Sequence, residues 1–287
     1  MLFVELTIQG IVQGAIYALV AVGLTLVYGL LRILHVAHAG LFTLGGYVGV
    51  VVTNATGSLL LALAAAMFAT GIAGVAMYRL CYEPILNRPP FIALIASIGL
   101  FIAMEEIFRL VFGPYGLSYT DPPLQQIVQI AGMNMRMAEI VTLLGAGVLI
   151  GGLAFLATQT RTGVAWRATV TVPQMAESFG VNIRSVRDLN FFVGSALAAA
   201  AGVMVTLLNN LVEPTMGSVP SYKALAIIVL GGLGDVRGTL IAALALGVIE
   251  SFGTIYLGDF MDRDAIAFAF LIVILMIRPQ GLFGKPA

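Results

Sequence analysis

Two histidines, His35 and His38, stand three residues apart in the run RILHVAHAG, and imidazole is the commonest side chain on protein-bound metals. A zinc site needs further ligands or the H-E-x-x-H pattern, and neither accompanies this pair. Two interpretations stay open. The histidines end a helix at the membrane interface, or they mark the mouth of a permeation path, in which case the path continues past Gly40 and Thr43.

No other group of residues has the make-up of a catalytic site, since the sequence pairs no nucleophile with a base. The C-terminal run GLFGKP lacks the spacing and the hydroxyl of the phosphate-binding loop G-x-x-x-x-G-K-[ST]. The single Cys81 cannot form an internal disulfide. We therefore expect a protein that is not an enzyme and that holds no metal, cofactor or ATP of its own.

Isolated charges inside apolar segments are the remaining candidates, because a charge in lipid is costly and usually faces protein or water. Glu250 is the one charge in the apolar run 239–257, and it faces either the helix bundle or a water-filled cavity. Glu105 and Glu106 precede Arg109 at helical spacing, which predicts pairing with that arginine near the outer surface.

The composition places these residues in a membrane. Hydrophobic residues make up 60% of the chain, charged residues only 10%, and the mean hydropathy is +1.03. These values indicate a polytopic protein surrounded by lipid, and the zero net charge gives no reason to expect a nucleic-acid partner. The start MLFVELTIQG lacks the basic region and cleavage site of a signal peptide, so we expect the first span to remain.

Nine apolar runs predict an all-α protein with eight or nine transmembrane helices. Two of the runs are short, so either could be re-entrant rather than crossing. With nine crossings the N-terminus lies outside and the C-terminus inside. The runs are 6–31, 41–53, 59–80, 91–112, 138–157, 189–208, 224–233, 239–257 and 265–277.

The loop 158–188 carries four of the 14 basic residues, Arg161, Arg167, Arg184 and Arg187, and is predicted to face the cytoplasm. Within it, residues 172–180 are expected to form a short helix that begins at Pro173 and is stopped by Gly180. Such a helix at the membrane surface is suited to contact another protein in the cytosol.

The two short runs resemble each other. LFTLGGYVG, residues 41–49, and IIVLGGLGD, residues 227–235, share an apolar lead, a double glycine and a later third glycine. Paired short segments interrupted by glycine predict two related halves and a transport site between them, here with Gly45, Gly46, Gly231 and Gly232 on the path. We expect these glycines to break their helices, so that free backbone groups can bind a polar substrate. The alternative is that they serve only close helix packing.

Motifs along almost the whole chain resemble the permease subunit of ATP-binding-cassette (ABC) importers for branched-chain amino acids. They are GAIYALVAVGLTLVYGLLRILHVAHAG, RATVTVPQMAESFGVNIRSVRDLNFFVGSALAAAAGVM, PTMG, KALAIIVLGGLGDVRGTLIAALALGVIES and RPQGLFGKP. The resemblance implies a single transmembrane permease domain, residues 1–287, of the type II-like importer class in the bacterial inner membrane. The implied partners are a homologous second permease, two ATPase subunits that bind ATP, and an extracytoplasmic substrate-binding protein.

The resemblance also implies that MAESFGVN is a coupling helix that docks on the ATPase. The docking or shaping residues would be Pro173, Gln174, Met175, Ala176, Glu177, Gly180, Val181, Asn182 and Arg184. The run HVAHAG departs from the Asn-Phe-Ala-His-Gly run usual in the family, and relatives also serve urea, short amides and aromatic acids. The substrate therefore stays open among these classes, and an ion-coupled secondary transporter is the more distant alternative.

Overall fold

The computed structural model describes residues 2–130, 133–258, 260, 262–278 and 281. Its helices are α1 Leu2–Leu31, α2 His38–Thr56, α3 Leu59–Met77, α4 Pro90–Phe112, α5 Met137–Gln159, α6 Arg161–Thr171, α7 Pro173–Ser178, α8 Ile183–Asn209, α9 Ser218–Gly231, α10 Val236–Tyr256 and α11 Arg263–Ile277. A π-helical turn, Tyr78–Tyr82, and a 3-10 turn, Glu83–Ile85, continue α3. The short strands are β1 Leu117–Ser118, β2 Ile127–Ile130, β3 Met133–Arg136 and β4 Leu211–Val212.

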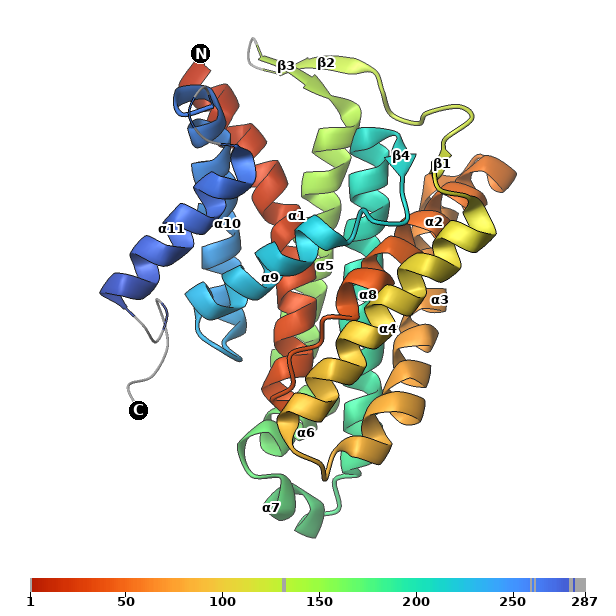
Figure 1. Ribbon diagram of the computed structural model, residues 1–287, viewed down its shortest axis with the longest axis vertical. Coiled ribbons are helices and arrows are strands. Elements are labelled where there is room, and N and C mark those ends of the chain that lie inside the picture. Colours follow the sequence, from red (N-terminus) through yellow and green to blue (C-terminus); the bar gives the residue numbers. More distant parts are fainter. Residues whose placement is uncertain (1, 131–132, 259, 261, 279–280, 282–287) are drawn as a thin grey trace.

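Two long helices, α1 and α8, form the centre of the molecule (Figure 1). In each of them, 78% of the most apolar 18-residue segment is buried, whereas the buried share of that segment is 17% in α4 and in α5. α1 is apolar on every side, so all its faces can be covered by other helices. α4 and α5 are equally apolar but lie outside, which is the arrangement expected where lipid replaces water as the neighbour.

The other helices pack on this centre in two groups. α2 and α3 lie against α8, while α9 and α10 lie against α1 and carry α11 on their outer side (Figure 1). The β2–β3 hairpin caps one end of the bundle, here called the hairpin end, and α6 and α7 project from the opposite end, here called the basic end. The polar run 113–136 forms the hairpin and the first strand of the β1–β4 pair.

The prediction of an all-α multi-pass membrane protein is confirmed. Within the described residues, seven helices are long and apolar enough to cross a membrane. The expected runs 224–233 and 265–277 correspond to α9 and α11, which are 14 and 15 residues long. The C-terminal RPQGLFGKPA, expected in the cytoplasm, falls mostly outside the described residues.

The break expected in the run 41–53 is wrong, because α2 is one continuous helix of 19 residues. Its glycines serve close packing instead. A methyl group at Gly45 would overlap the backbone of Ala199 in α8, and one at Gly49 would lie 2.8 Å from Val203. In lipid, where apolar side chains gain little by leaving solvent, such close backbone approach is a main source of helix association.

Replacing Gly45 with alanine is expected to lower the thermal stability of the detergent-solubilised protein. The added methyl group meets backbone, which can move only with the whole helix, so we expect a loss of about 1–3 kcal/mol. Gly147→Ala is the matched control, since a Cβ at that glycine of α5 has no atom within 4 Å. Equal melting temperatures for the two variants, measured by fluorescence-detected size exclusion after heating, would contradict the packing role.

The second double glycine lies at a different place in its helix. α9 ends at Gly231, and Gly232 has φ 101°, so this pair terminates a helix, whereas Gly45 and Gly46 lie within one. Gly231 is also a site of close approach, because a methyl group there would overlap the backbone of Thr239 at the start of α10. The two glycine motifs thus match in sequence but not in their position within a helix.

Candidate functional site

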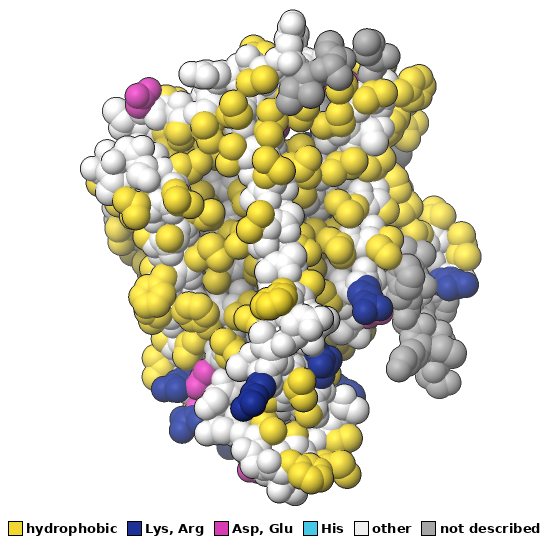
Figure 2. All heavy atoms as spheres, turned by 180° about the vertical axis from the view of Figure 1, so that it is seen from behind, with side chains coloured by type: hydrophobic (Ala, Val, Ile, Leu, Met, Phe, Trp, Pro, Cys, Tyr) yellow, Lys and Arg dark blue, Asp and Glu magenta, His cyan; other side chains and the backbone are white. Residues whose placement is uncertain are grey.

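Arginine side chains gather toward the basic end of the molecule, as the dark blue spheres in Figure 2 show. The loop that contains α6 and α7 supplies Arg161 and Arg167, and the first turns of α8 supply Arg184 and Arg187. The apolar surface above them carries few charges in this view. An apolar belt that ends in a basic rim is the pattern expected of the cytoplasmic boundary of a membrane protein.

Capping residues define each helix at this end. The hydroxyl of Thr160 accepts a hydrogen bond from the Gly163 amide at the start of α6, with an oxygen–nitrogen distance of 3.1 Å. Pro173 opens α7, and the Asn182 side chain accepts a hydrogen bond from the Ser185 amide, at 3.2 Å, to open α8. Because each first turn has a local cap or a proline, three separate helices form here rather than one.

Gly180 ends α7 through a Schellman motif. Its amide donates to the carbonyl of Glu177 at 2.9 Å, and the Val181 amide donates to the carbonyl of Ala176 at 3.1 Å. Gly180 has φ 84°, the left-handed conformation that this motif requires of the residue after the helix. The expected stop at Gly180 is therefore confirmed, and the helix itself covers Pro173–Ser178.

Most residues assigned to docking lie on the tip formed by α7 and the turn after it, whereas Arg184 lies in the first turn of α8 and pairs with Glu83. Met175 is 59% exposed, and Ala176 is buried. Phe179 is 83% exposed and was missed by the sequence interpretation. The sequence did contain a signal for Phe179, since it is a large apolar residue beside a stop glycine in a polar loop. The tip thus presents two apolar side chains beyond the basic rim.

The two histidines are buried rather than exposed at an interface, which corrects the first interpretation of them. His35 lies in the extended segment between α1 and α2, and its Nδ1 is 2.7 Å from the hydroxyl of Tyr82. His38 begins α2, and its Nε2 is 3.2 Å from the carbonyl of Val20 in α1. The rings are 1% and 2% exposed.

The remaining path candidates fall into separate groups. Thr43 lies at the contact between the first turns of α2 and α9, where a methyl group at Gly217 would meet its hydroxyl at 2.6 Å. Gly40 of the same turn contacts Met104 of α4. Gly231 and Gly232 lie at the far end of α9, and Glu250 lies in α10. The described structure therefore does not bring all the predicted path residues into one cavity.

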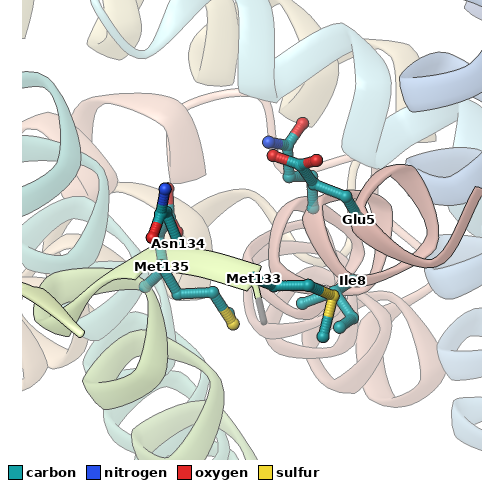
Figure 3. A pocket seen from close by; sticks show the side chains of 7 residues that line it. Glu5, Ile8, Met133, Asn134 and Met135 are labelled. Atoms are coloured by element: carbon teal, nitrogen blue, oxygen red, sulfur yellow. The ribbon is translucent and has the colours of Figure 1, made fainter. Parts of the chain in front are cut away.

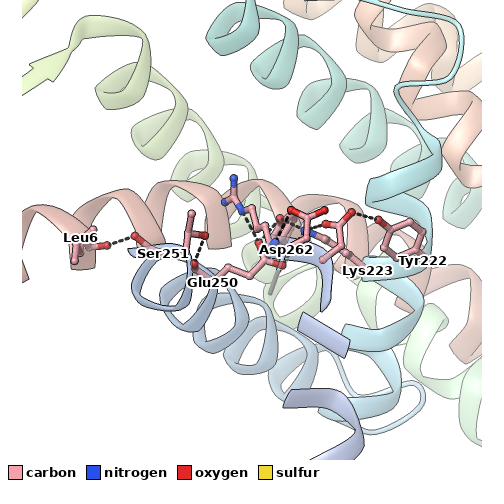
Figure 4. A network of polar contacts seen from close by, with 10 residues as sticks. Leu6, Tyr222, Lys223, Glu250, Ser251 and Asp262 are labelled. Carbon is pink, nitrogen blue, oxygen red and sulfur yellow. Dashed lines mark hydrogen bonds and ion pairs between the residues drawn. The ribbon is translucent and has the colours of Figure 1, made fainter. Parts of the chain in front are cut away.

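Glu250 faces the bundle and is the centre of a buried charge network (Figure 4). Its two carboxylate oxygens lie 2.8 Å from Nζ of Lys223 in α9 and 3.0 Å from Nε of Arg263 in α11. The Tyr17 hydroxyl of α1 donates to Glu250 at 2.7 Å, and Lys223 also pairs with Asp264 at 2.9 Å. Two positive and two negative groups thus join α9, α10 and α11 with no net charge, and the Tyr17 hydroxyl adds α1.

Sequence reading identified only Glu250 in this network. Lys223, Arg263 and Asp264 were not predicted, because none of the three lies within a predicted apolar run. Glu250 is fully buried and Lys223 is 3% exposed. A usable signal is that one unpaired carboxylate in a span requires a cation elsewhere in the bundle.

The predicted pairing of Arg109 is confirmed for one of the two glutamates. Arg109 Nη1 lies 2.7 Å from Glu106 on the exposed side of α4. Glu105 instead accepts a hydrogen bond from the Ser218 hydroxyl at 3.0 Å. Glu105 therefore joins α4 to the first residue of α9 near the contact of α9 with α2.

A shallow pocket at the hairpin end separates the first turns of α1 from β3 (Figure 3). Its lining residues are Glu5, Ile8, Gln9, Met133, Asn134, Met135 and Glu139. None of them belongs to the predicted path or docking sets, so this pocket is separate from both.

The fold and these features define a multi-pass helical membrane protein that displays a short capped helix at one end. The chain belongs to the family described as branched-chain amino acid transport system / permease component, whose model matches residues 6–278. It is 31% identical to the high-affinity branched-chain amino acid transport system permease protein LivH of Escherichia coli K12, over 99% of this chain and 96% of that protein. The identity to BraD of Pseudomonas aeruginosa, a protein of the same description, is 29% with the same coverage.

More distant matches agree with this assignment. The permease protein LivM of the Escherichia coli branched-chain amino acid system is 24% identical over 93% of this chain and 67% of its own length. A solved structure, PsaBC from Streptococcus pneumoniae in complex with Fab, has a TM-score of 0.53 at 10% identity and covers 99% of this chain and 94% of that chain. The structural likeness supports the fold alone.

Proposed function

We propose that this chain is a transmembrane subunit of an ATP-driven ABC importer for branched-chain amino acids in the bacterial inner membrane. The observation that carries the proposal is the family match over residues 6–278, together with relatives named as permeases of such transport systems. The chain is not the ATPase in this proposal; two partner subunits bind and hydrolyse ATP. An extracytoplasmic binding protein delivers the substrate.

The translocation path is proposed to form between this chain and a homologous second permease. The match to LivM supports such a partner, because LivH and LivM are both named as permeases of the branched-chain amino acid system of Escherichia coli. The contact between the first turns of α2 and α9, with Thr43, Glu105 and Ser218, is our candidate for the part of the path in this chain.

We propose nine crossings, including the 14-residue α9 and the 15-residue α11, with the N-terminus outside. Two related halves also remain part of the proposal. What supports them is that α1 and α8 are each followed by an extended segment and then by a shorter helix, and that these shorter helices, α2 and α9, meet at their first turns. Helix N-termini that point at the substrate are common at transport sites.

The exposed tip at the basic end is proposed to dock into a groove of the ATPase. Phe179 and Met175 supply apolar anchors, and aromatic anchors in fitted pockets dominate the affinity of protein interfaces. When ATP closes the ATPase pair, the tip moves with it and the attached helices change between outward and inward access. Binding energy of ATP thereby selects one of two arrangements of the permease.

Affinity purification of the tagged chain from its native membrane tests the assembly. We expect the second permease and the ATPase subunits to co-purify in detergent. The complex in liposomes, with the binding protein outside, should take up leucine only when ATP is present. A chain that purifies alone and drives uptake under an ion gradient without ATP would favour the secondary transporter instead.

The substrate is tested by competition in the same liposomes. Unlabelled valine and isoleucine are expected to suppress uptake of labelled leucine, whereas urea, acetamide and benzoate are not. Suppression by one of the latter three, with no ATP-dependent leucine uptake, would keep the importer mechanism and replace the substrate class.

Phe179→Ala is expected to weaken recovery of the ATPase with the tagged permease by roughly fivefold, because an interface anchor is lost. Phe260→Ala is the matched control, since Phe260 is 87% exposed but lies between α10 and α11, away from the basic end. Quantitative mass spectrometry of the purified complexes measures both. Equal ATPase recovery in the two variants would remove Phe179 from the docking surface.

A further inference from the structure

We propose that the π-turn Tyr78–Tyr82, with Glu83 after it, transmits movement of the α7 tip to the start of α2. Arg79, Tyr82 and Glu83 act as positioning residues in this proposal, because none of them needs to touch the substrate or the ATPase. The inference rests on the proposed docking function of α7. It adds a defined route by which docking reaches the interior of the permease.

The π-turn is bound to the first turns of α8 by two ion pairs. Arg79 forms a two-pronged contact with Asp188, with nitrogen–oxygen distances of 2.6 and 3.2 Å. Arg184 lies 2.9 Å from Glu83. The arginine lies on the π-turn in one pair and on α8 in the other, so the two segments can pair in only one register and one relative direction. Bidentate arginine–carboxylate contacts are the most geometrically specific of such pairs.

The first turn of α8 moves with the docking tip because almost no free chain separates them. α7 ends at Ser178 and α8 begins at Ile183. Of the four residues between them, Gly180 and Val181 donate to α7 carbonyls, and the Asn182 side chain accepts from the Ser185 amide of α8. A displacement of the tip is therefore carried into Arg184 and Asp188 rather than absorbed by a flexible linker.

The buried side of the same turn contacts the segment that leads into α2. The Tyr82 hydroxyl lies 2.7 Å from Nδ1 of His35, and the rings of Tyr82 and His35 meet edge to face at 5.2 Å. Phe191 of α8 stacks on Tyr78 at 4.8 Å and lies 5.5 Å from His35. One aromatic cluster thus joins the π-turn, α8 and the approach to α2.

The segment that would receive the movement is suited to change shape. Residues 32–37 form no regular helix, and Arg32 has φ 54°, an uncommon conformation for a residue other than glycine. The π-turn itself departs from α-helical geometry, and such turns often mark functional points in helices. His38 at the end of this segment begins α2, whose first turn meets that of α9. A shift at His35 is thereby passed to both short helices.

The ion pairs contribute little to stability, which makes the proposal testable. The side chains of Arg79 and Arg184 are 53% and 63% exposed, and exposed pairs typically contribute less than about 1 kcal/mol. Their removal should therefore leave folding and assembly intact. A change in coupling between ATP hydrolysis and uptake is then not explained by loss of protein.

The experiment measures ATP hydrolysed per leucine taken up by the complete importer in liposomes. Arg79→Ala and Asp188→Ala are each expected to raise this ratio about fivefold, and the double variant should be no worse than either single one. Tyr82→Phe, which keeps the ring and removes the hydroxyl, should raise the ratio as well. The controls are Glu106→Ala, which removes an ion pair on α4, and Tyr119→Phe, which removes a hydroxyl contact with Thr206.

The outcomes separate this inference from the function on which it rests. If wild type shows no ATP-dependent uptake of leucine, the proposed function fails. If wild type is coupled and the π-turn variants keep its ratio, the transmission route is wrong and the function stands. Additive effects of Arg79→Ala and Asp188→Ala would also overturn the route, because residues acting through one contact cannot add.

Discussion

Glu250→Gln is expected to cause the largest loss of stability of any single substitution considered, about 3–5 kcal/mol. The amide has the shape of the carboxylate but no charge, so Lys223 keeps only Asp264 as a counter-ion and Arg263 loses the partner described here. Glu250 is fully buried and Lys223 is 3% exposed, so water cannot compensate Lys223 for the lost carboxylate charge. The melting temperature of the purified protein in detergent measures the effect.

Two comparisons decide whether charge balance is the cause. Glu106→Gln also removes a carboxylate that pairs with arginine, but its side chain is 53% exposed, and the expected change is within about 0.5 kcal/mol. The triple variant Tyr17→Phe, Lys223→Met, Glu250→Leu removes the buried pair together with the hydroxyl that bridges it. Because apolar replacement of a buried ion pair is often neutral, it should recover most of the lost stability.

A different result would change the role assigned to Glu250. If Glu250→Gln melts like wild type, the network does not hold α1, α9, α10 and α11 together. If the triple variant is stable yet the importer containing it no longer takes up leucine, the charges serve transport rather than folding. The other interpretation from sequence, a charge beside a water-filled cavity, would then regain weight.

The sequence predicted those features that are determined by neighbouring residues. Hydropathy located the long spans to within a few residues at most ends, since a bilayer-spanning helix needs a long apolar run whatever it packs against. The short helix α7 was predicted because Pro173 and Gly180 act on their own backbone, one by opening a helix and the other by adopting a left-handed φ. Neither effect depends on the rest of the fold.

Features that depend on distant contacts could not be predicted in this way. The double glycine of α2 was expected to break a helix, but Gly45 faces Ala199, more than 150 residues later, and close packing keeps the helix whole. Lys223 and Tyr17 gave no local sign that they meet at Glu250. One of the two interpretations placed the histidines at an interface, because the burial of His35 comes from Tyr82 and Phe191, which are distant in sequence.

Two groups of charges, one buried and one exposed, therefore have different roles in this chain. The buried network is balanced and joins four helices, so its removal affects folding. The ion pairs at the basic end have exposed arginines and join α8 to the π-turn, so we expect their removal to affect the coupling between ATP hydrolysis and uptake. Stability measurements and coupling measurements should accordingly respond to different residues, a separation that helix packing alone does not predict.

Gly180→Val is expected to lower ATP-driven leucine uptake at least tenfold while leaving the permease folded. A Cβ at Gly180 has no atom within 4 Å, so the substitution meets no steric obstacle. The cost comes from φ 84°, which for a residue other than glycine is unfavourable by about 1–2 kcal/mol, and β-branching adds to it. A penalty of this size lowers the population of the Schellman motif relative to other conformations by about 5- to 30-fold.

Loss of the motif would release the Val181 amide from Ala176 and turn Phe179 away from its docking position, because the turn fixes the direction of that side chain. Gly180→Asn is the matched control, since asparagine tolerates the left-handed conformation and should retain most of the uptake. The melting temperature should be the same for both variants, as the tip is exposed. If the Gly180→Val and Gly180→Asn variants take up leucine equally well, the backbone conformation of Gly180 does not set the coupling. If both variants lose uptake, the ATPase recognises the exposed surface at this position rather than the backbone conformation.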